Sequence, residues 1–112
     1  MATRRLSPQR SLYNLGSVHR IPVGEGRTFH IEDIPVAVFR ARNGKVFATQ
    51  AFCSHKQGPL SDGIVGADKV ICPLHAYKFD LTTGDALGHG CPALQTYSVS
   101  LDAQGDILLV LE

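Results

Sequence analysis

Short apolar runs separated by turn residues dominate the chain from about Phe29 onward. Seven of them stand out: TFHI, VAVFRA, KVFATQA, KVIC, KFDL, QTYSVSL and DILLVL. They are rich in Val, Ile, Thr, Tyr and Phe, the side chains that favour strands, and each is four to seven residues long. No window of ten or more residues carries an apolar stripe with helical spacing. The pattern therefore predicts an all-β fold.

The most distinct local unit is VAVFRARNGKVFATQ, which places Asn43 and Gly44 between two strand-like runs. These residue types tolerate the positive φ angles of a two-residue hairpin turn, so we predict such a hairpin here. The stretches LTTGD and LDAQGD are further candidate turns.

The first 20 residues differ from the rest. They carry Arg4, Arg5, Arg10 and Arg20 with no acidic residue and little apolar periodicity. We expect a loosely structured N-terminal segment over residues 1–20, followed by a single domain over 21–112. The Arg4-Arg5 pair resembles a twin-arginine export signal, but the following stretch is broken by Ser, Pro, Gln, Asn and Gly.

Composition narrows the function classes. The 112 residues are 44% hydrophobic and carry a net charge of +1, which argues against a disordered tail or a strongly electrostatic nucleic-acid binder. No apolar run approaches the roughly 18 residues of a membrane span, so we expect no membrane association and a cytoplasmic location. Three cysteines in a reducing compartment favour metal binding over disulfides.

Two loops each supply one cysteine and one histidine. Cys53 and His55 lie in CSHKQGPLSDG, and Cys72 and His75 lie in CPLHAYKFD, with sixteen residues between His55 and Cys72. Thiolate and imidazole bind soft or borderline metals, so the four side chains make a candidate metal site. Serine or cysteine nucleophile arrangements, phosphate-binding glycine loops and carboxylate pairs are not recognisable, and we therefore expect no catalytic residues.

The order of the ligands distinguishes two kinds of metal centre. Structural zinc usually takes two like ligands from each arm, whereas here Cys and His alternate. In a Rieske [2Fe-2S] cluster, two thiolates hold one iron and two imidazoles hold the other. Loops that each give one Cys and one His meet that requirement, although a zinc-stabilised interaction module remains an alternative.

The C-x-H and C-x2-H boxes, with Pro73 in the second, resemble the Rieske family. The stretches VAVFRARNGKVFATQAFCSH, CPLHAYKFDLTTGDAL and CPALQTYSV are similar to its branch of NAD(P)H-dependent nitrite reductase small subunits. The resemblance implies antiparallel β-sheets with an inserted cluster-binding subdomain over about residues 50–88. It also implies one [2Fe-2S] cluster bound by Cys53, His55, Cys72 and His75.

The same resemblance implies an electron-transfer role. The partner would be a large sirohaem and flavin nitrite reductase subunit that converts nitrite to ammonium, and this chain would not be catalytic alone. The alternative is a Rieske ferredoxin that carries electrons from a reductase to a ring-hydroxylating dioxygenase.

Departures from the respiratory-chain Rieske branch carry information. The cysteines that form a disulfide there correspond to Gly58 and Leu74, and the hydroxyl groups near the cluster correspond to Tyr77 and Phe79. The loss of hydrogen bonds to sulfur implies a low reduction potential.

The remaining expectations concern the surface around the cluster. Cys91, in the third loop GHGCPA, is expected to be a small apolar filler near the cluster. The partner is expected to approach the edge held by the two histidines, where Lys56 and Lys78 flank the ligands.

Overall fold

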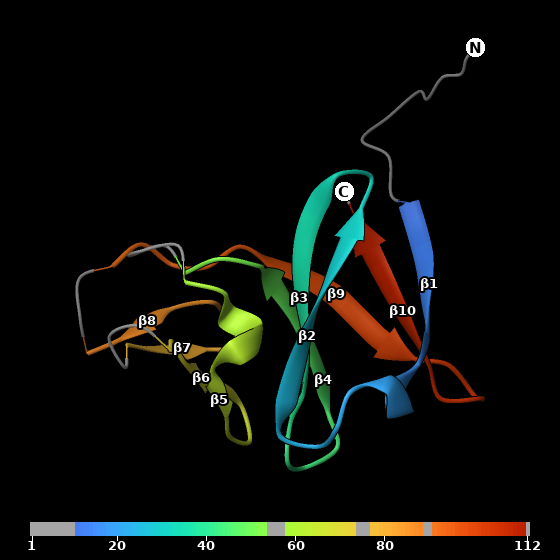
Figure 1. Cartoon of the computed structure of the whole chain (residues 1–112), viewed down its shortest axis with the longest axis horizontal. Coiled ribbons are helices and arrows are strands. Elements are labelled where there is room, and N and C mark those ends of the chain that lie inside the picture. Colours follow the sequence, from blue (N-terminus) through green and yellow to red (C-terminus); the bar gives the residue numbers. More distant parts are fainter. Residues whose placement is uncertain (1–10, 54–57, 74–76, 89–90, 112) are drawn as a thin grey trace.

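The computed structural model describes residues 11–53, 58–73, 77–88 and 91–111. Within them the chain forms two antiparallel sheets and two short 3-10 helices (Figure 1). The elements are β1 (Ser11–Ser17), η1 (Val18–Arg20), β2 (Glu25–Ile31), β3 (Ile34–Arg40), β4 (Val46–Gln50), η2 (Leu60–Asp62), β5 (Ile64–Val65), β6 (Lys69–Ile71), β7 (Lys78–Asp80), β8 (Ala86–Leu87), β9 (Thr96–Leu101) and β10 (Asp106–Leu111). The predicted all-β fold is confirmed.

The larger sheet is a curled, six-stranded framework with the order β1-β10-β9-β4-β3-β2. It surrounds a buried core, which we call the framework core. Its members are Val18, Ile21, Ile31, Val36, Val38, Ala48, Ile107, Leu109 and Leu111. Strand β10 shows the alternation that produces this core, because Ile107, Leu109 and Leu111 are buried while the residues between them are partly exposed.

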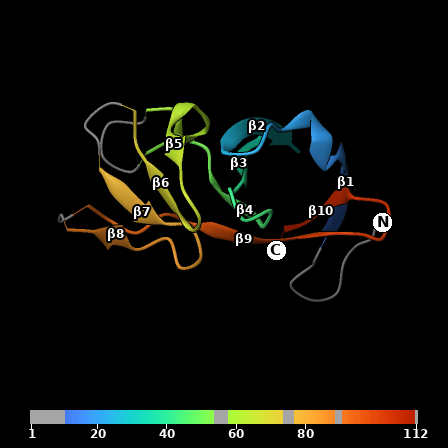
Figure 2. The same ribbon diagram turned by 90° about the horizontal axis from the view of Figure 1, so that it is seen from below.

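The smaller sheet has the order β5-β6-β7-β8 and is inserted between β4 and β9 of the framework. Figure 2 shows it as a separate lobe, connected to the framework through β9 and the chain that follows β4. This arrangement is the inserted subdomain that the family resemblance implied. We call it the cluster subdomain.

Strand β3 joins the two parts because both of its faces are buried. Val36 and Val38 belong to the framework core, whereas Ala37 and Phe39 face a second buried cluster that includes residues of the cluster subdomain. Gly26 of β2 lies against Phe39, and a Cβ at that position would collide with the ring. The cluster subdomain is therefore packed on a rigid, doubly buried strand.

The seven strands predicted from the apolar runs are all present, and no end differs by more than three residues. Strand β1 is different, since residues 11–17 were expected in a loose lead-in and instead pair with β10, from Ser11 opposite Leu111 to Ser17 opposite Asp106. Strand β10 lies at the other end of the chain, so the local sequence pattern around residues 11–17 does not predict this pairing. Strands β5 and β8 were also missed, because each has only two residues.

The Asn43-Gly44 hairpin is confirmed, but its turn is not the predicted two-residue type. The Ala41 N–H donates to the Lys45 carbonyl at 2.8 Å, which leaves a three-residue loop. Gly44 has a φ of 88°, whereas Asn43 is not among the residues with positive φ. Its side-chain oxygen instead accepts the Lys45 N–H at 3.0 Å.

A two-residue turn with positive φ at both positions does occur, between β2 and β3. Its residues are Glu32, with a φ of 52°, and Asp33, with a φ of 69°. The strands pair up to the turn itself, where Ile31 lies opposite Ile34. In the part of the chain that the structure describes, no helix is long and apolar enough to cross a membrane.

Candidate metal centre

Cys53 and Cys72 are brought into one buried cluster, although they lie in different loops. Cys53 is 1% exposed and Cys72 is 2% exposed. Their apolar neighbours in this cluster, which we call the site core, are Ala37, Phe39, Ala41, Leu60, Val65, Val70, Phe79, Leu81 and Leu94. The two other predicted ligands, His55 and His75, lie outside the described residues.

Each cysteine stands at the base of its loop and closes it in the same way. The Cys53 N–H donates to the Gly58 carbonyl at 2.8 Å, and the Cys72 N–H donates to the Tyr77 carbonyl at 2.7 Å. Both bonds span five positions. The two segments are therefore closed by matching hydrogen bonds, and each carries one Cys and one His in the sequence.

Backbone pairing next to each cysteine holds the two ends of its loop together. Under the first loop, the Leu60 N–H donates to the Ala51 carbonyl at 2.9 Å, and Phe52 forms an antiparallel bridge with Pro59. Under the second, β6 and β7 pair with Ile71 opposite Lys78. Alternation along each segment then turns both cysteines inward, since Phe52 and Ile71 beside them are more exposed.

A third segment packs against the same cluster. Cys91 is partly buried and lies against the site core, and Leu94 is buried within it. The Leu94 N–H donates to the Gly84 carbonyl at 2.7 Å, and a Cβ at Gly84 would collide with the Leu94 carbonyl oxygen. Cys91 thus packs against the buried cluster that also contains the two predicted thiolate ligands.

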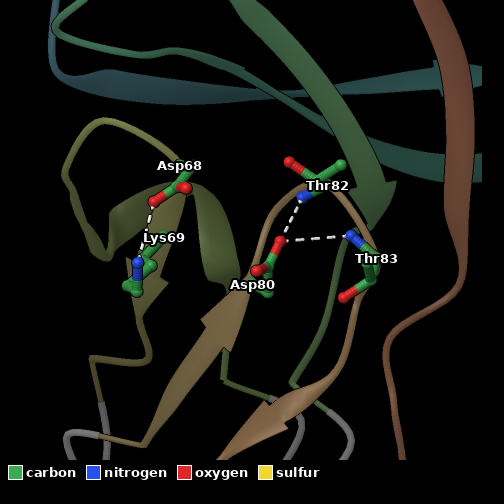
Figure 3. A network of polar contacts seen from close by, with 5 residues as sticks. All are labelled: Asp68, Lys69, Asp80, Thr82 and Thr83. Atoms are coloured by element: carbon green, nitrogen blue, oxygen red, sulfur yellow. Dashed lines mark hydrogen bonds and ion pairs between the residues drawn. The ribbon is translucent and has the colours of Figure 1, made fainter.

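The β7–β8 turn is shaped by one carboxylate. Asp80 accepts the main-chain N–H of Thr82 at 2.7 Å and that of Thr83 at 3.2 Å (Figure 3). The nearby Lys69 is exposed, and its pKa is raised by the hydrogen bond to Asp68 and by the charge of that carboxylate. Such an exposed ion pair contributes little to stability.

Tyr77 and Phe79 both contribute to the packing of the site core. Phe79 is fully buried in the site core together with both cysteines, and Tyr77 packs against that core from its edge. A phenylalanine offers no hydroxyl group to a sulfur atom. The environment of the two thiols is therefore apolar and shielded from water on the Phe79 side.

The donor set fits a metal centre. Buried thiols in an apolar cluster suit thiolate ligands once a cation balances their charge. Among the residues that the structure describes, no three His, Cys, Asp or Glu side chains gather closely enough to hold a metal ion. Completion of the site by His55 and His75 is therefore a proposal rather than an observed geometry.

Sequence reasoning missed Gln50, which links two of the three segments around the site. Its amide nitrogen donates to the Phe52 carbonyl at 2.8 Å, and its amide oxygen accepts the Gln95 N–H at 2.7 Å. The first cluster loop and the segment after Cys91 are therefore tied to the end of β4. A glutamine at a strand end carries no recognisable signal of this role.

A family model described as the Rieske [2Fe-2S] domain matches residues 11–98. Among curated proteins, the ferredoxin component of biphenyl 2,3-dioxygenase from Rhodococcus jostii is 39% identical over 90 residues, which cover 80% of this chain and 82% of that protein.

Solved structures give the same fold. A protein described as an NADH-dependent nitrite reductase small subunit, from Mycobacterium tuberculosis, superposes with a TM-score of 0.85 at 22% identity, covering 94% of this chain and 98% of that one. A second protein, described as the small subunit of an NADPH nitrite reductase, has a TM-score of 0.80 at 25% identity and covers 90% of this chain and 99% of its own.

Proposed function

The chain belongs to the Rieske [2Fe-2S] family and is an electron-transfer protein with a [2Fe-2S] cluster, and from this premise we propose that it is the small subunit of an NAD(P)H-dependent nitrite reductase. In this role it passes electrons within an enzyme that reduces nitrite to ammonium, and its partner is a large subunit with flavin and sirohaem. The observation that carries the proposal is the correspondence with a small subunit of this kind over 90% of the chain at 25% identity.

We propose that Cys53 and Cys72 hold one iron of the cluster and that His55 and His75 hold the other. The bound cluster supplies reversible one-electron transfer. The matched hydrogen bonds at the two cysteines fix the loops, and the site core keeps water away from the thiolates.

The discriminating experiment is purification of the tagged protein from its own host under native conditions. The host is grown with nitrate as the sole nitrogen source. A partner with the absorption of sirohaem and bound flavin supports the proposal. A deletion strain that still grows at the normal rate on nitrate contradicts it, provided that growth on ammonium is also unchanged.

A Rieske ferredoxin of a ring-hydroxylating dioxygenase is the second candidate, and the 39% identity to the biphenyl 2,3-dioxygenase component favours it. This identity is higher than that to the nitrite reductase small subunit. The same purification distinguishes the two, because a ferredoxin would bring down a flavin reductase or an oxygenase with no sirohaem.

A further inference from the structure

An open groove of about 360 Å³ lies beside Cys53, on the side where β3 begins and β4 ends. Figure 1 shows where β3 begins and where β4 ends, the two places from which most of its lining residues come. Its lining includes Ile34, Pro35, Gln50, Phe52, Cys53 and Tyr97, and none of its described lining residues is charged. The groove therefore leads from the surface to a predicted cluster ligand.

The walls of the groove expose large apolar side chains. Ile34 is 41% exposed, and Phe52 is 42% exposed between the buried Ala51 and Cys53. Other described phenylalanines are buried or partly buried. An aromatic side chain that faces water next to a redox centre is typical of a surface that a partner covers.

The groove is rigid as well as apolar. The Gln50 side chain forms hydrogen bonds with the backbone of Phe52 and of Gln95. An antiparallel bridge to Pro59 also holds the backbone of Phe52. A preformed surface loses little conformational entropy when it is covered. This rigidity favours a docking surface over a segment that merely failed to pack.

The rim of the groove is acidic and strained. Glu32 and Asp33 are exposed and immediately precede Ile34, and both have positive φ angles. The β3–β4 loop of the same chain uses glycine for this conformation. Residues that keep a disfavoured backbone angle cluster at functional sites, where their side chains are needed.

We propose that this groove, with its Glu32-Asp33 rim, is a docking surface for the redox partner. The occupant is a protein surface with an apolar projection ringed by Lys or Arg. The inference rests on the proposed function, in which that protein is the large nitrite reductase subunit. One electron passes from its reduced flavin to the oxidised chain, and no covalent bond forms or breaks.

The proposed surface differs in charge from the histidine edge. Lys56 and Lys78 flank the predicted ligands there and suit an acidic partner surface, whereas the groove suits a basic one.

The first test removes the two rim charges with Glu32→Gln and Asp33→Asn together. The matched control, Asp68→Asn with Asp85→Asn, removes two charges from turns of the cluster subdomain. Reduction by NADH through the large subunit is followed by stopped flow over a salt series. We expect the rim variant to react about tenfold more slowly at low salt and to lose most of its salt dependence.

The second test truncates the apolar wall with Phe52→Ser. Its control is Ile64→Ser, because Ile64 is 67% exposed on the edge strand β5, away from the groove lining. We expect only Phe52→Ser to weaken binding of the large subunit, by about tenfold. Reduction by dithionite and the cluster spectrum must be unchanged in every variant that is compared.

The groove proposal is overturned if both groove variants stay within twofold of their controls. Failure of the proposed function has a different signature, because then wild-type protein accepts no electrons from the large subunit. The same four variants are in that case compared with the flavin reductase of a dioxygenase system. Selective loss in the groove variants supports the surface there, and equal rates refute it.

Discussion

Cys53 and Cys72 have similar surroundings, which suit both of them as ligands of a metal centre. Each cysteine donates its N–H across the base of its own loop, and both side chains are buried in the site core. Cys91 packs against the same core but is only partly buried. The first two therefore have the environment of ligands, whereas Cys91 has that of a neighbour.

Substitution of either ligand cysteine is expected to remove the cluster. In Cys53→Ser or Cys72→Ser the iron content should fall to a small fraction of the wild-type value, because a neutral hydroxyl replaces the thiolate that binds iron. Cys91→Ser is the control and should retain both colour and iron. Equal loss of iron in the Cys91 variant would show that the ligand assignment is wrong.

Phe79 is expected to keep the reduction potential low. A hydroxyl group placed here can donate to a cluster sulfur and stabilise the reduced, more negative state. We predict a wild-type potential near the low end of the range of roughly −150 to +300 mV and a higher potential in Phe79→Tyr. Voltammetry measures both, with Phe79→Leu as the control. A potential that is unchanged in the Tyr variant contradicts this role.

At the level of elements, the β2–β3 turn holds two acidic residues at positive φ angles, which lowers the stability of the fold. Glu32→Asn with Asp33→Gly should raise the free energy of unfolding by about 1–2 kcal/mol, because Asn and Gly adopt positive φ at lower cost. The opposite change, Gly44→Ala, should lower it by about 1 kcal/mol, since an added Cβ there meets no atom and only φ matters. Urea denaturation of the oxidised protein measures both, and a destabilised turn variant would show that the carboxylates support the fold.

Local patterns predicted the elements whose causes are local. The apolar runs marked seven strands because each is a short run of strand-forming side chains between turn residues, as in DILLVL of β10, where every second side chain is buried. Strand β1 escaped because its stability comes from pairing with the far end of the chain. The Glu32-Asp33 turn was not predicted because both residues have positive φ, whereas Asn and Gly are the residues that usually mark such a turn.

In the candidate site, too, only the features with a local sequence pattern could be predicted. The spacing of Cys and His in two loops marked the candidate ligands, and the structure brings Cys53 and Cys72 together in the site core. Gln50 and the groove were not predictable, because they depend on where β4 ends relative to Gln95 and Ile34. Such juxtapositions are properties of the assembled fold.

At the scale of the whole molecule, the two sheets have separate tasks. The six-stranded framework carries its own core. The cluster subdomain shares a second core, the site core, with strand β3 of the framework. In Figure 2 the cluster subdomain projects from one side of the framework. Both cores therefore meet at β3, which has buried residues on each of its faces.

The measurement that tests the central claim most directly is iron and acid-labile sulfide analysis of the protein purified without oxygen from iron-replete cells. Because the chain belongs to the Rieske [2Fe-2S] family and we propose Cys53, His55, Cys72 and His75 as the ligands, we predict two irons and two sulfides per chain and a red-brown colour. Stoichiometric zinc without sulfide would contradict the account, because four ligands of these types can also form a structural zinc site.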